Sequence, residues 1–343
     1  KRTWNAITNK SQSGSYPLNT HDTQTFKPFN SFWNWLTGKH TLKAYIDAYG
    51  RNPFVSMIIN DIAFTTASIK RIAVDKNDEE IKNSVILELL GNPNPNQSQI
   101  EFLEIMGKYY EATGNTFVRH IQGIGGIGNE LQVLEADRVI INCNKINEVV
   151  SYAYTTPLGR IITIPAEEIE HIHEANIVNT EGEEAKYGLS KLCAAMIVVQ
   201  SSDEKFVADA SMAKNKGIAG IVTTDSDTPM LPDEQKAMQE EYDKDSAGAG
   251  NFGRIRVSTT KLKYLQMGMS PSDLKILEGM VSSLRILCSS YGLSSILFND
   301  TESSTFNNMS EATISAYTKV YIPTANKFDD KLSRFLSRRL KVE

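Results

Sequence analysis

Two long helical segments, separated by a stretch of mixed pattern, constrain the fold of this chain most. Residues 189–214 repeat apolar side chains every seven positions, at Leu192, Val199, Phe206 and Ala213. Residues 271–291 carry an apolar stripe on one helical face, formed by Leu274, Leu277, Val281, Leu284, Cys288 and Tyr291. Stripes at this spacing are typical of helices that bury one side. We therefore expect two long helices, each packed against another element.

The segment between these helices, residues 217–268, has the pattern of a small α/β unit. Strands are expected at 217–223 and 261–266, and a short charged helix at 232–245 that opens with a proline. In one compact domain, such an insert between two long helices would be unusual. In a ring of subunits, it lets the helices reach a separate rim and return.

The part after the second long helix begins with a polar loop at 292–308. A third long helix is expected from about Met309, within residues 309–343. Pro323 predicts a kink or interruption there, because proline removes a backbone donor and crowds the preceding turn.

Residues 52–188 combine helical and strand periods, so the expected fold class is α+β. Helices are expected at 52–66 and 98–113, with a strand-like stretch at 68–74 between them. Six short runs then have the period of strands, at 116–122, 132–134, 139–142, 149–155, 161–164 and 169–172. Turns separate these runs, which predicts an antiparallel, strand-rich domain.

Charge is distributed unevenly along the chain, whose formal net charge is −5. Residues 1–51 carry seven basic and two acidic side chains, and residues 331–343 carry five and one. This leaves 24 basic and 38 acidic side chains in residues 52–330, a net of −14. Proteins that grip nucleic acid usually present a basic face. This chain has an acidic body with basic ends, so if DNA meets the body, it is passed along and not held.

The first 51 residues are polar and irregular, with an aromatic cluster at Phe29, Phe32, Trp33 and Trp35. We interpret them as an N-terminal arm. The arm either docks its aromatic side chains on a neighbouring subunit or folds onto its own domain.

Several signals of other protein classes are missing from the sequence. No run of about eighteen apolar residues predicts a membrane helix, and the first residues lack a signal-peptide pattern. The three cysteines are widely separated, without a CxxC pair, so neither a zinc site nor a disulfide framework is expected. We expect an intracellular chain with no membrane partner, no metal and no cofactor.

Three features imitate functional sites. The glycine-rich run 123–128 lies between strands and lacks a following Lys-Ser/Thr, so a hairpin turn is favoured over a phosphate loop. His171 and His173 share a strand face, but no third ligand is identifiable, so a surface-facing strand edge is favoured over a metal site. The acidic runs, at 78–80, 181–184 and 240–241, are typical of solvated faces. A metal-dependent nuclease is therefore disfavoured but stays an alternative.

Eight short motifs follow one another along roughly 270 residues. They are Asn52-Pro53-Phe54-Val55, Leu90 to Asn96 followed by Phe102, Tyr109 to Val118, Leu131 to Val139, Tyr187-Gly188-Leu189-Ser190, Ile286 to Leu293, Ser304 to Asn308, and Tyr321-Ile322-Pro323. In this order they resemble the portal proteins of tailed bacteriophages, the family typified by phage HK97. One position departs from the pattern, since Ser294 stands where the family has proline.

The resemblance implies a non-enzymatic ring of subunits, usually twelve, around an axial DNA channel at one capsid vertex. It assigns 52–188 to the wing, 189–214 and 271–291 to the stem, 217–268 to the clip, 292–308 to a channel (tunnel) loop, and 309–343 to a helix leading to the crown. Implied partners are double-stranded DNA, the terminase large subunit, a head–tail adaptor and the major capsid protein. The chain would reside in the virion at the portal vertex, and in the host cytoplasm during assembly. Another phage structural component is the alternative closest to this interpretation.

The resemblance also suggests site residues. In the channel loop, the candidates for contact with DNA are Ser295, Phe298, Asn299, Asn307 and Asn308. Phe298 and Phe306 equally fit a role in pinning the loop to neighbouring subunits. Possible channel-facing residues of the first stem helix and its end are Lys205, Lys214 and Lys216. Candidate residues for docking partners on the clip are Asp233, Glu234, Glu240, Arg254 and Arg256.

Overall fold

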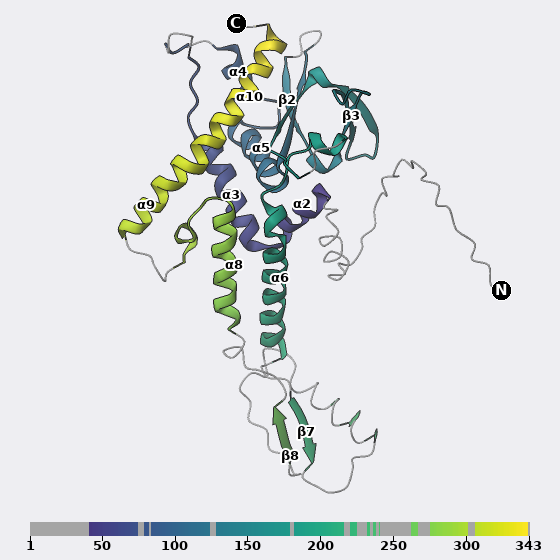
Figure 1. Cartoon of the computed structure of the whole chain (residues 1–343), viewed down its shortest axis with the longest axis vertical. Coiled ribbons are helices and arrows are strands. Elements are labelled where there is room, and N and C mark those ends of the chain that lie inside the picture. The colour runs from purple at the N-terminus through teal and green to yellow at the C-terminus, as the bar shows by residue number, and fades with distance from the viewer. Residues whose placement is uncertain are drawn as a thin grey trace, which may run out of the picture.

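The chain forms a body of helices and two small sheets, from which two helices project side by side (Figure 1). The computed structural model describes residues 41–74, 79–81, 84–123, 128–178, 182–215, 220–224, 232–233, 236–237, 240, 262–266, 275–300 and 306–341. Everything below concerns these residues.

Helices α3 (Pro53–Ser68) and α5 (Gln99–Thr113) form the centre of the body, close to the helices expected from the sequence. Asn52 caps α3 by accepting from the backbone amides of Phe54 and Val55. Ser98 and Glu101 form a reciprocal capping box at the start of α5. A Cβ at Gly107 of α5 would lie 3.2 Å from Cβ of Ala63 in α3, so glycine permits the close approach of the two helices.

The strand expected at 68–74 is wrong. Residues 69–73 form no sheet, and only Val74 makes an isolated bridge, to Glu80. Arg71 is used differently: its guanidinium donates to the carbonyls of Ala67 and Thr66 at the end of α3. It also pairs with Asp329 at 2.7 Å. Arg71 therefore satisfies backbone carbonyls at the end of α3, and residues 69–73 pair with no strand in the part of the chain that the structure describes.

The last part of residues 1–51, expected to be irregular, forms helix α2 (Leu42–Arg51), so the prediction is wrong for these residues. Its Tyr45 and Ala48 are buried in the same apolar cluster as α3. The aromatic cluster at 29–35 lies outside the described residues.

Two three-stranded antiparallel sheets confirm all six expected strands. The first has the order β2 (Glu130–Leu134), β1 (Asn115–Ile121), β6 (Ile169–His173), and the second has the order β3 (Val139–Cys143), β4 (Val149–Thr155), β5 (Ile161–Pro165). Their inner faces share one apolar cluster, in which the rings of Phe117 and Tyr152 lie 5.8 Å apart. The 123–128 run joins the paired strands β1 and β2 as a hairpin connection, although 124–127 lie outside the described residues.

Helices α6 (Leu192–Asn215) and α8 (Ile276–Ser290) form the projecting pair. Beyond their far ends lie β7 (Gly220–Thr224) and β8 (Leu262–Gln266), which pair antiparallel (Figure 1). The two long helices and the two insert strands thus occur close to where the sequence predicts them. Most of the helix expected at 232–245, and the expected start of α8 at Pro271, lie outside the described residues.

The third long helix begins at Phe306, earlier than expected. It consists of α9 (Phe306–Ala316), a π-helical turn at Tyr317–Tyr321, and α10 (Ile322–Leu340). The predicted irregularity near Pro323 therefore takes the form of a widened turn directly before it. A π turn relieves the contact between a proline ring and the preceding carbonyls without ending the helix.

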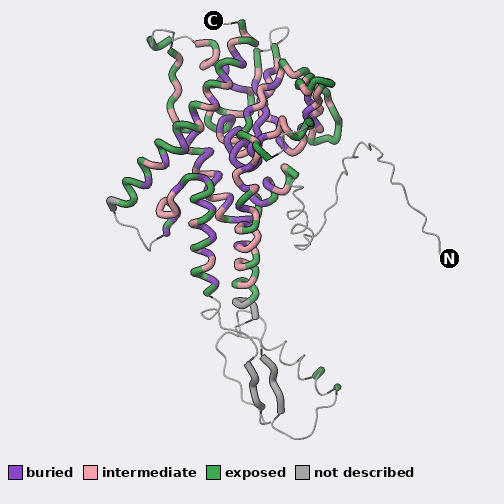
Figure 2. Tube along the Cα trace, viewed as in Figure 1, coloured by how far each residue is buried: buried purple, intermediate pink, exposed green. Residues whose placement is uncertain are grey.

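The remaining described elements are short. They are α4 (Val85–Gly91), η1 (Ala136–Arg138), η2 (Ala166–Glu168), η3 (Glu183–Lys186) and η5 (Ser295–Phe298). Buried residues concentrate in the body and along one side of α8, whereas those of α6 lie only in its first half, next to the body (Figure 2). Among the described helices, none combines the length and the apolar character needed to cross a lipid bilayer.

Candidate functional site

The projecting helix pair is held to the body by a close contact between two backbone segments. Gly114, at the end of α5, has φ +73°, and a Cβ there would lie 2.6 Å from the carbonyl carbon of Leu189. A Cβ at Gly188 would lie 2.2 Å from the carbonyl oxygen of Gly114. Asn115 joins the segments by accepting from the amide of Gly188 at 2.6 Å and donating to its carbonyl at 3.0 Å. Only glycine fits at these two positions, so the motifs 109–118 and 187–190 interlock.

A buried ion pair extends this junction to both projecting helices. The side chain of Glu111 in α5 is fully buried, and Lys191, just before α6, donates to it at 2.8 Å. Tyr291, after α8, donates to the backbone carbonyl of Glu111 at 3.0 Å, and the Lys191 ammonium lies 5.5 Å from its ring centre. Burial raises the pKa of Glu111, while Lys191 acts against this shift. The junction therefore fixes α6 and α8 to the same turn of α5.

Asn52 adds a second attachment between the body and α6. Besides capping α3, its side-chain amide donates to Ser202 and Asp203 of α6, both at 2.7 Å. Asn52 and Ser202 are both fully buried. The Asn-Pro-Phe motif thus starts one helix and positions another.

Helix α10 is tied to α5 and β6 by a smaller network. Glu174 accepts from Tyr110 of α5 and from Lys327 of α10, the latter at 2.9 Å. Burial acts to raise the pKa of Glu174, but these two donors outweigh it and lower the pKa. The carboxylate is therefore held ionised between three elements.

The described part of residues 292–308, the segment expected to form a channel loop, folds back on the end of α8. Arg285 of α8 binds Asp300 in a bidentate ion pair at 2.6 and 2.8 Å. Ser295 donates to the same carboxylate at 2.8 Å. Asn299 has φ +62° and is exposed. The loop is therefore anchored at both ends of residues 295–300, with Asn299 at its surface.

The candidate DNA-contacting residues have different environments. Phe298 is 9% exposed and packs in an apolar cluster of the same chain, and its expected contact with DNA or with a neighbouring subunit stays a prediction. Ser295 is half-buried, and Asn308 is exposed near the start of α9. The side chains of Asn307 and of Phe306, the other residue expected to pin the loop, lie outside the described part of the structure.

Lys205 lies between the projecting helices. Its ammonium donates to the carbonyl of Gly279 and the hydroxyl of Ser283, both in α8 and both at 3.0 Å. It thus joins the two helices in the described subunit, and its exposure to a channel stays a prediction. The side chain of Lys214 and the whole of Lys216 lie outside the described residues.

The clip residues are only partly described. Asp233 and Glu240 occupy exposed helical positions. Glu234, Arg254 and Arg256 lie outside the described residues.

The two strand histidines do not both face solvent. His173 is exposed, whereas the ring of His171 stacks on Phe117 at 4.2 Å and accordingly faces the sheet interior. Burial, followed by the nearby His173 and Lys331, lowers the pKa of His171 to about 3. The surface-facing expectation is wrong for His171 because its side of β6 is covered by the second sheet. In the described part of the chain, no three His, Cys, Asp or Glu side chains gather closely enough to hold a metal ion.

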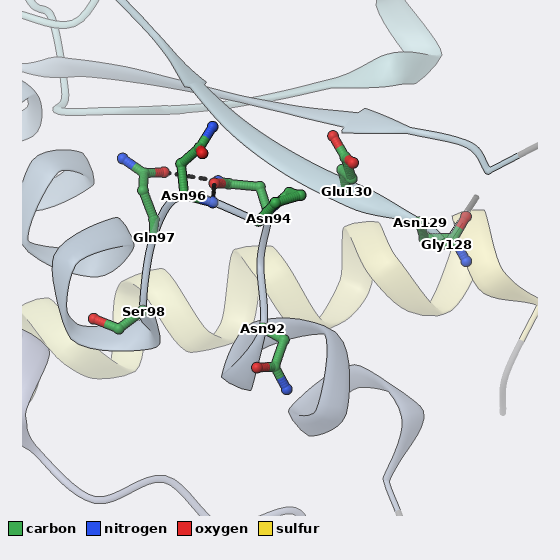
Figure 3. A pocket seen from close by; sticks show the side chains of 9 residues that line it. Asn92, Asn94, Asn96, Gln97, Ser98, Gly128, Asn129 and Glu130 are labelled. Atoms are coloured by element: carbon green, nitrogen blue, oxygen red, sulfur yellow. Dashed lines mark hydrogen bonds between the residues drawn. The ribbon is translucent and has the colours of Figure 1, made fainter.

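The asparagine–proline turn borders an open pocket of about 600 Å³ (Figure 3). Asn94 donates to Gln97 at 2.7 Å and to the carbonyl of Leu131 in β2 at 3.0 Å. The amide of Leu131 donates in turn to Pro93 at 2.6 Å. The turn therefore covers backbone groups on the outer edge of β2, which protects a sheet edge from pairing with another chain.

The junction residues were not identified as functional from the sequence. Their motifs were recognised one by one, but the contacts of Glu111 with Lys191 and Tyr291 connect positions far apart in the chain. No local spacing signals such a contact.

The fold is that of a structural component. Its two projecting helices are attached through the junction to a body of helices and strands. The sequence model of the phage portal protein family matches residues 53–343, and the chain belongs to this family. Its function is that of a portal protein, a structural part of the particle and not an enzyme. This confirms the resemblance recognised in the sequence motifs.

Relatives and solved structures agree with this family. An uncharacterized protein of Rickettsia felis is 23% identical over 317 residues, covering 88% of this chain and 78% of the relative. One of Rickettsia bellii is 22% identical over 301 residues, covering 86% and 77%. The fold is similar to a chain in the neck of an empty gene transfer agent (GTA) particle computed with C6 symmetry, with TM-score 0.67, 23% identity, and 88% and 82% of the two chains covered. It is also similar to an HK97 family phage portal protein from Corynebacterium diphtheriae, with TM-score 0.54, 13% identity and coverage of 78% and 82%.

Proposed function

We propose that this portal protein forms a closed ring of twelve copies around a channel for double-stranded DNA. The ring occupies one vertex of the virion, where DNA is packaged and ejected, after assembly in the host cytoplasm. The observation that carries the proposal is the projection of α6 and α8 from the body, with β7 and β8 beyond their ends (Figure 1). One of the similar structures, a neck of a native GTA particle, was computed with C12 symmetry.

The subunit divides into parts that fit such a ring. Residues 52–188 form the outer wing, α6 and α8 the stem, and 217–268 the clip. Residues 292–308 form the channel loop, in which Asn299 and Asn308 are the described candidate residues that are exposed and thus accessible to DNA at the loop surface. Residues 309–343 lead to the crown. The interlocked glycines at 114 and 188 keep the stem at a fixed angle to the wing.

Charge supports passage in preference to tight binding. Duplex DNA carries one negative charge per about 1.7 Å of its axis, so a basic lining would hold it at every step. The net charge of −14 in residues 52–330, from 24 basic and 38 acidic side chains, keeps such contacts weak. The force for DNA movement must then come from a separate motor.

The partners follow from the position of each part. The clip, with Asp233 and Glu240 exposed, docks the terminase large subunit during packaging and the head–tail adaptor afterwards. The wing contacts the major capsid protein.

Electron microscopy of the purified full chain, together with native mass spectrometry, tests the ring. We expect closed twelve-membered rings with a central hole wide enough for duplex DNA. A chain that stays monomeric under all assembly conditions contradicts the proposal. A monomer that cleaves DNA only when magnesium is added would instead favour the nuclease alternative.

A further inference from the structure

Helix α10 carries a straight row of basic side chains on one face. The row consists of Lys327, Lys331, Arg334, Arg338 and Lys341. Spacings of four, three and four residues place the first four on one side of a helix with 3.6 residues per turn, and Lys341 follows directly after the last residue of α10. At 1.5 Å per residue the basic row is about 21 Å long.

Carboxylates hold the row in place without covering it. Lys327 pairs with Glu174, the residue after β6, at 2.9 Å, and Arg338 pairs with Glu170 of β6 at 3.6 Å. Arg334 pairs with Asp330 at 2.9 Å within the helix. The side chains of Arg334 and Arg338 are nevertheless both 74% exposed. Their guanidinium groups are therefore positioned yet open to a further partner.

The row keeps an excess of positive charge on an acidic body. The five cations of the row pair with three carboxylates, those of Glu174, Asp330 and Glu170. Asp329, a further acidic residue of α10, pairs with Arg71 instead. Arg339 adds one more charge beside the row, where it donates to Nδ1 of His120 at 3.3 Å. Burial, followed by the charge of Arg339, lowers the pKa of His120, so the imidazole is neutral near pH 7 and adds no charge to the row.

The surface around the row lacks the features of a protein interface. Protein interfaces place apolar or aromatic side chains at their centre. Among the described residues of α10 after Pro323, no large apolar side chain is exposed. Ser333 and Ser337 flank the arginines, and hydroxyl groups of this kind also donate to phosphates. The chemistry fits a polyanion better than a folded protein.

We propose that the basic row binds the phosphate backbone of duplex DNA without sequence preference. The C-terminal half of α10 lies at the end of the molecule opposite β7 and β8 (Figure 1). In the proposed ring, this is the end facing the capsid interior, so the row meets packaged DNA and not DNA inside the stem. The choice of DNA as the partner rests on the proposed function.

Fluorescence anisotropy with a labelled 30-base-pair duplex tests the row, using the assembled full chain over a salt series. Arg334→Gln with Arg338→Gln removes two phosphate contacts and should weaken binding about tenfold near 0.1 M salt, lowering the log–log salt slope by about 2. Lys145→Gln with Arg160→Gln is the matched control, because both side chains are exposed on loops of the β3-β4-β5 sheet. The control should bind as the wild type does. Equal effects of the two double variants, or none from the row variant, would overturn the proposal.

Lys341→Gln is a second row variant, used in case the Arg334→Gln with Arg338→Gln variant fails to fold. Lys341 is the exposed residue that follows the last residue of α10, and its replacement should lower the salt slope by about 1. Unchanged DNA binding by both row variants in intact rings would reject the row as a DNA site and leave the portal ring standing. Absence of rings in the wild type would instead reject the proposed ring, whatever the row binds.

Discussion

The half-buried ring of His171 leads to a prediction about stability and pH. Its Nε2 lies 3.0 Å from Oδ1 of Asn115, and its ring stacks on Phe117 between the two sheets. The pKa of His171 falls from its ordinary value of 6.5 to about 3, chiefly through burial. The unfolded chain therefore binds this proton more readily than the folded chain. Stability from the neutral ring is complete above pH 6.5 and declines as the pH drops below it.

The size of the effect follows from the two pKa values. One pKa unit corresponds to about 1.4 kcal/mol, so between pH 7.5 and pH 5.0 the folded state should lose about 2 kcal/mol through His171. His171→Gln keeps a side-chain N–H donor toward Asn115 but does not titrate. The variant should therefore lack this share of the pH dependence, even if its stability at pH 7.5 is lower.

Urea unfolding of wild type and variant at both pH values, followed by far-ultraviolet circular dichroism, measures the difference. His173→Gln on the same strand is the control, because that ring is exposed and its replacement should leave most of the loss in place. Parallel pH dependences in wild type and His171→Gln would refute the reasoning. Glu170 and Glu111, whose pKa values are raised, act in the opposite direction, but they are present in both proteins and cancel in the comparison.

Two further predictions concern the junction and the loop. Gly114→Ala should cost about 3 kcal/mol or more, because neighbouring backbone must move, whereas Gly159→Ala, at a similar positive φ but in open space, should cost about 1 kcal/mol. Thermal unfolding of both variants measures this, and equal losses would mean that the close approach is unimportant. Arg285→Met should cost about 1–2 kcal/mol and increase protease cleavage near residue 300, because buried Asp300 loses its bidentate partner while Arg285 itself is partly exposed. Lys275→Met, which breaks a surface ion pair, should do neither.

The elements and the family of this chain could be predicted from local sequence. Strand runs from 116 to 172 were located within a few residues, because alternating and β-branched side chains mark half-buried strands directly. The stripes of 189–214 and 271–291 likewise located α6 and α8. The stretch 68–74 has the composition of a strand but none of its partners, which is why that prediction failed.

The candidate site could be predicted only in part. The order of the motifs identified the family, but the roles of single residues in the loop depended on packing. Phe298 was expected at the channel or at a neighbouring subunit, and it is buried in its own core. Lys205 was expected to face the channel, and its described contacts are with α8.

The sequence by itself determined most of the helices and strands and the membership in the portal family, because periodicity, capping residues and ordered motifs act over short stretches of chain. Only the tertiary structure decided how these pieces are joined. Gly114 meets Gly188, and Glu111 meets Lys191 and Tyr291. The basic row of α10 pairs with one carboxylate in β6 and with one directly after it. These contacts join residues distant in sequence, and their geometry depends on the packing of the whole body, which no local pattern records.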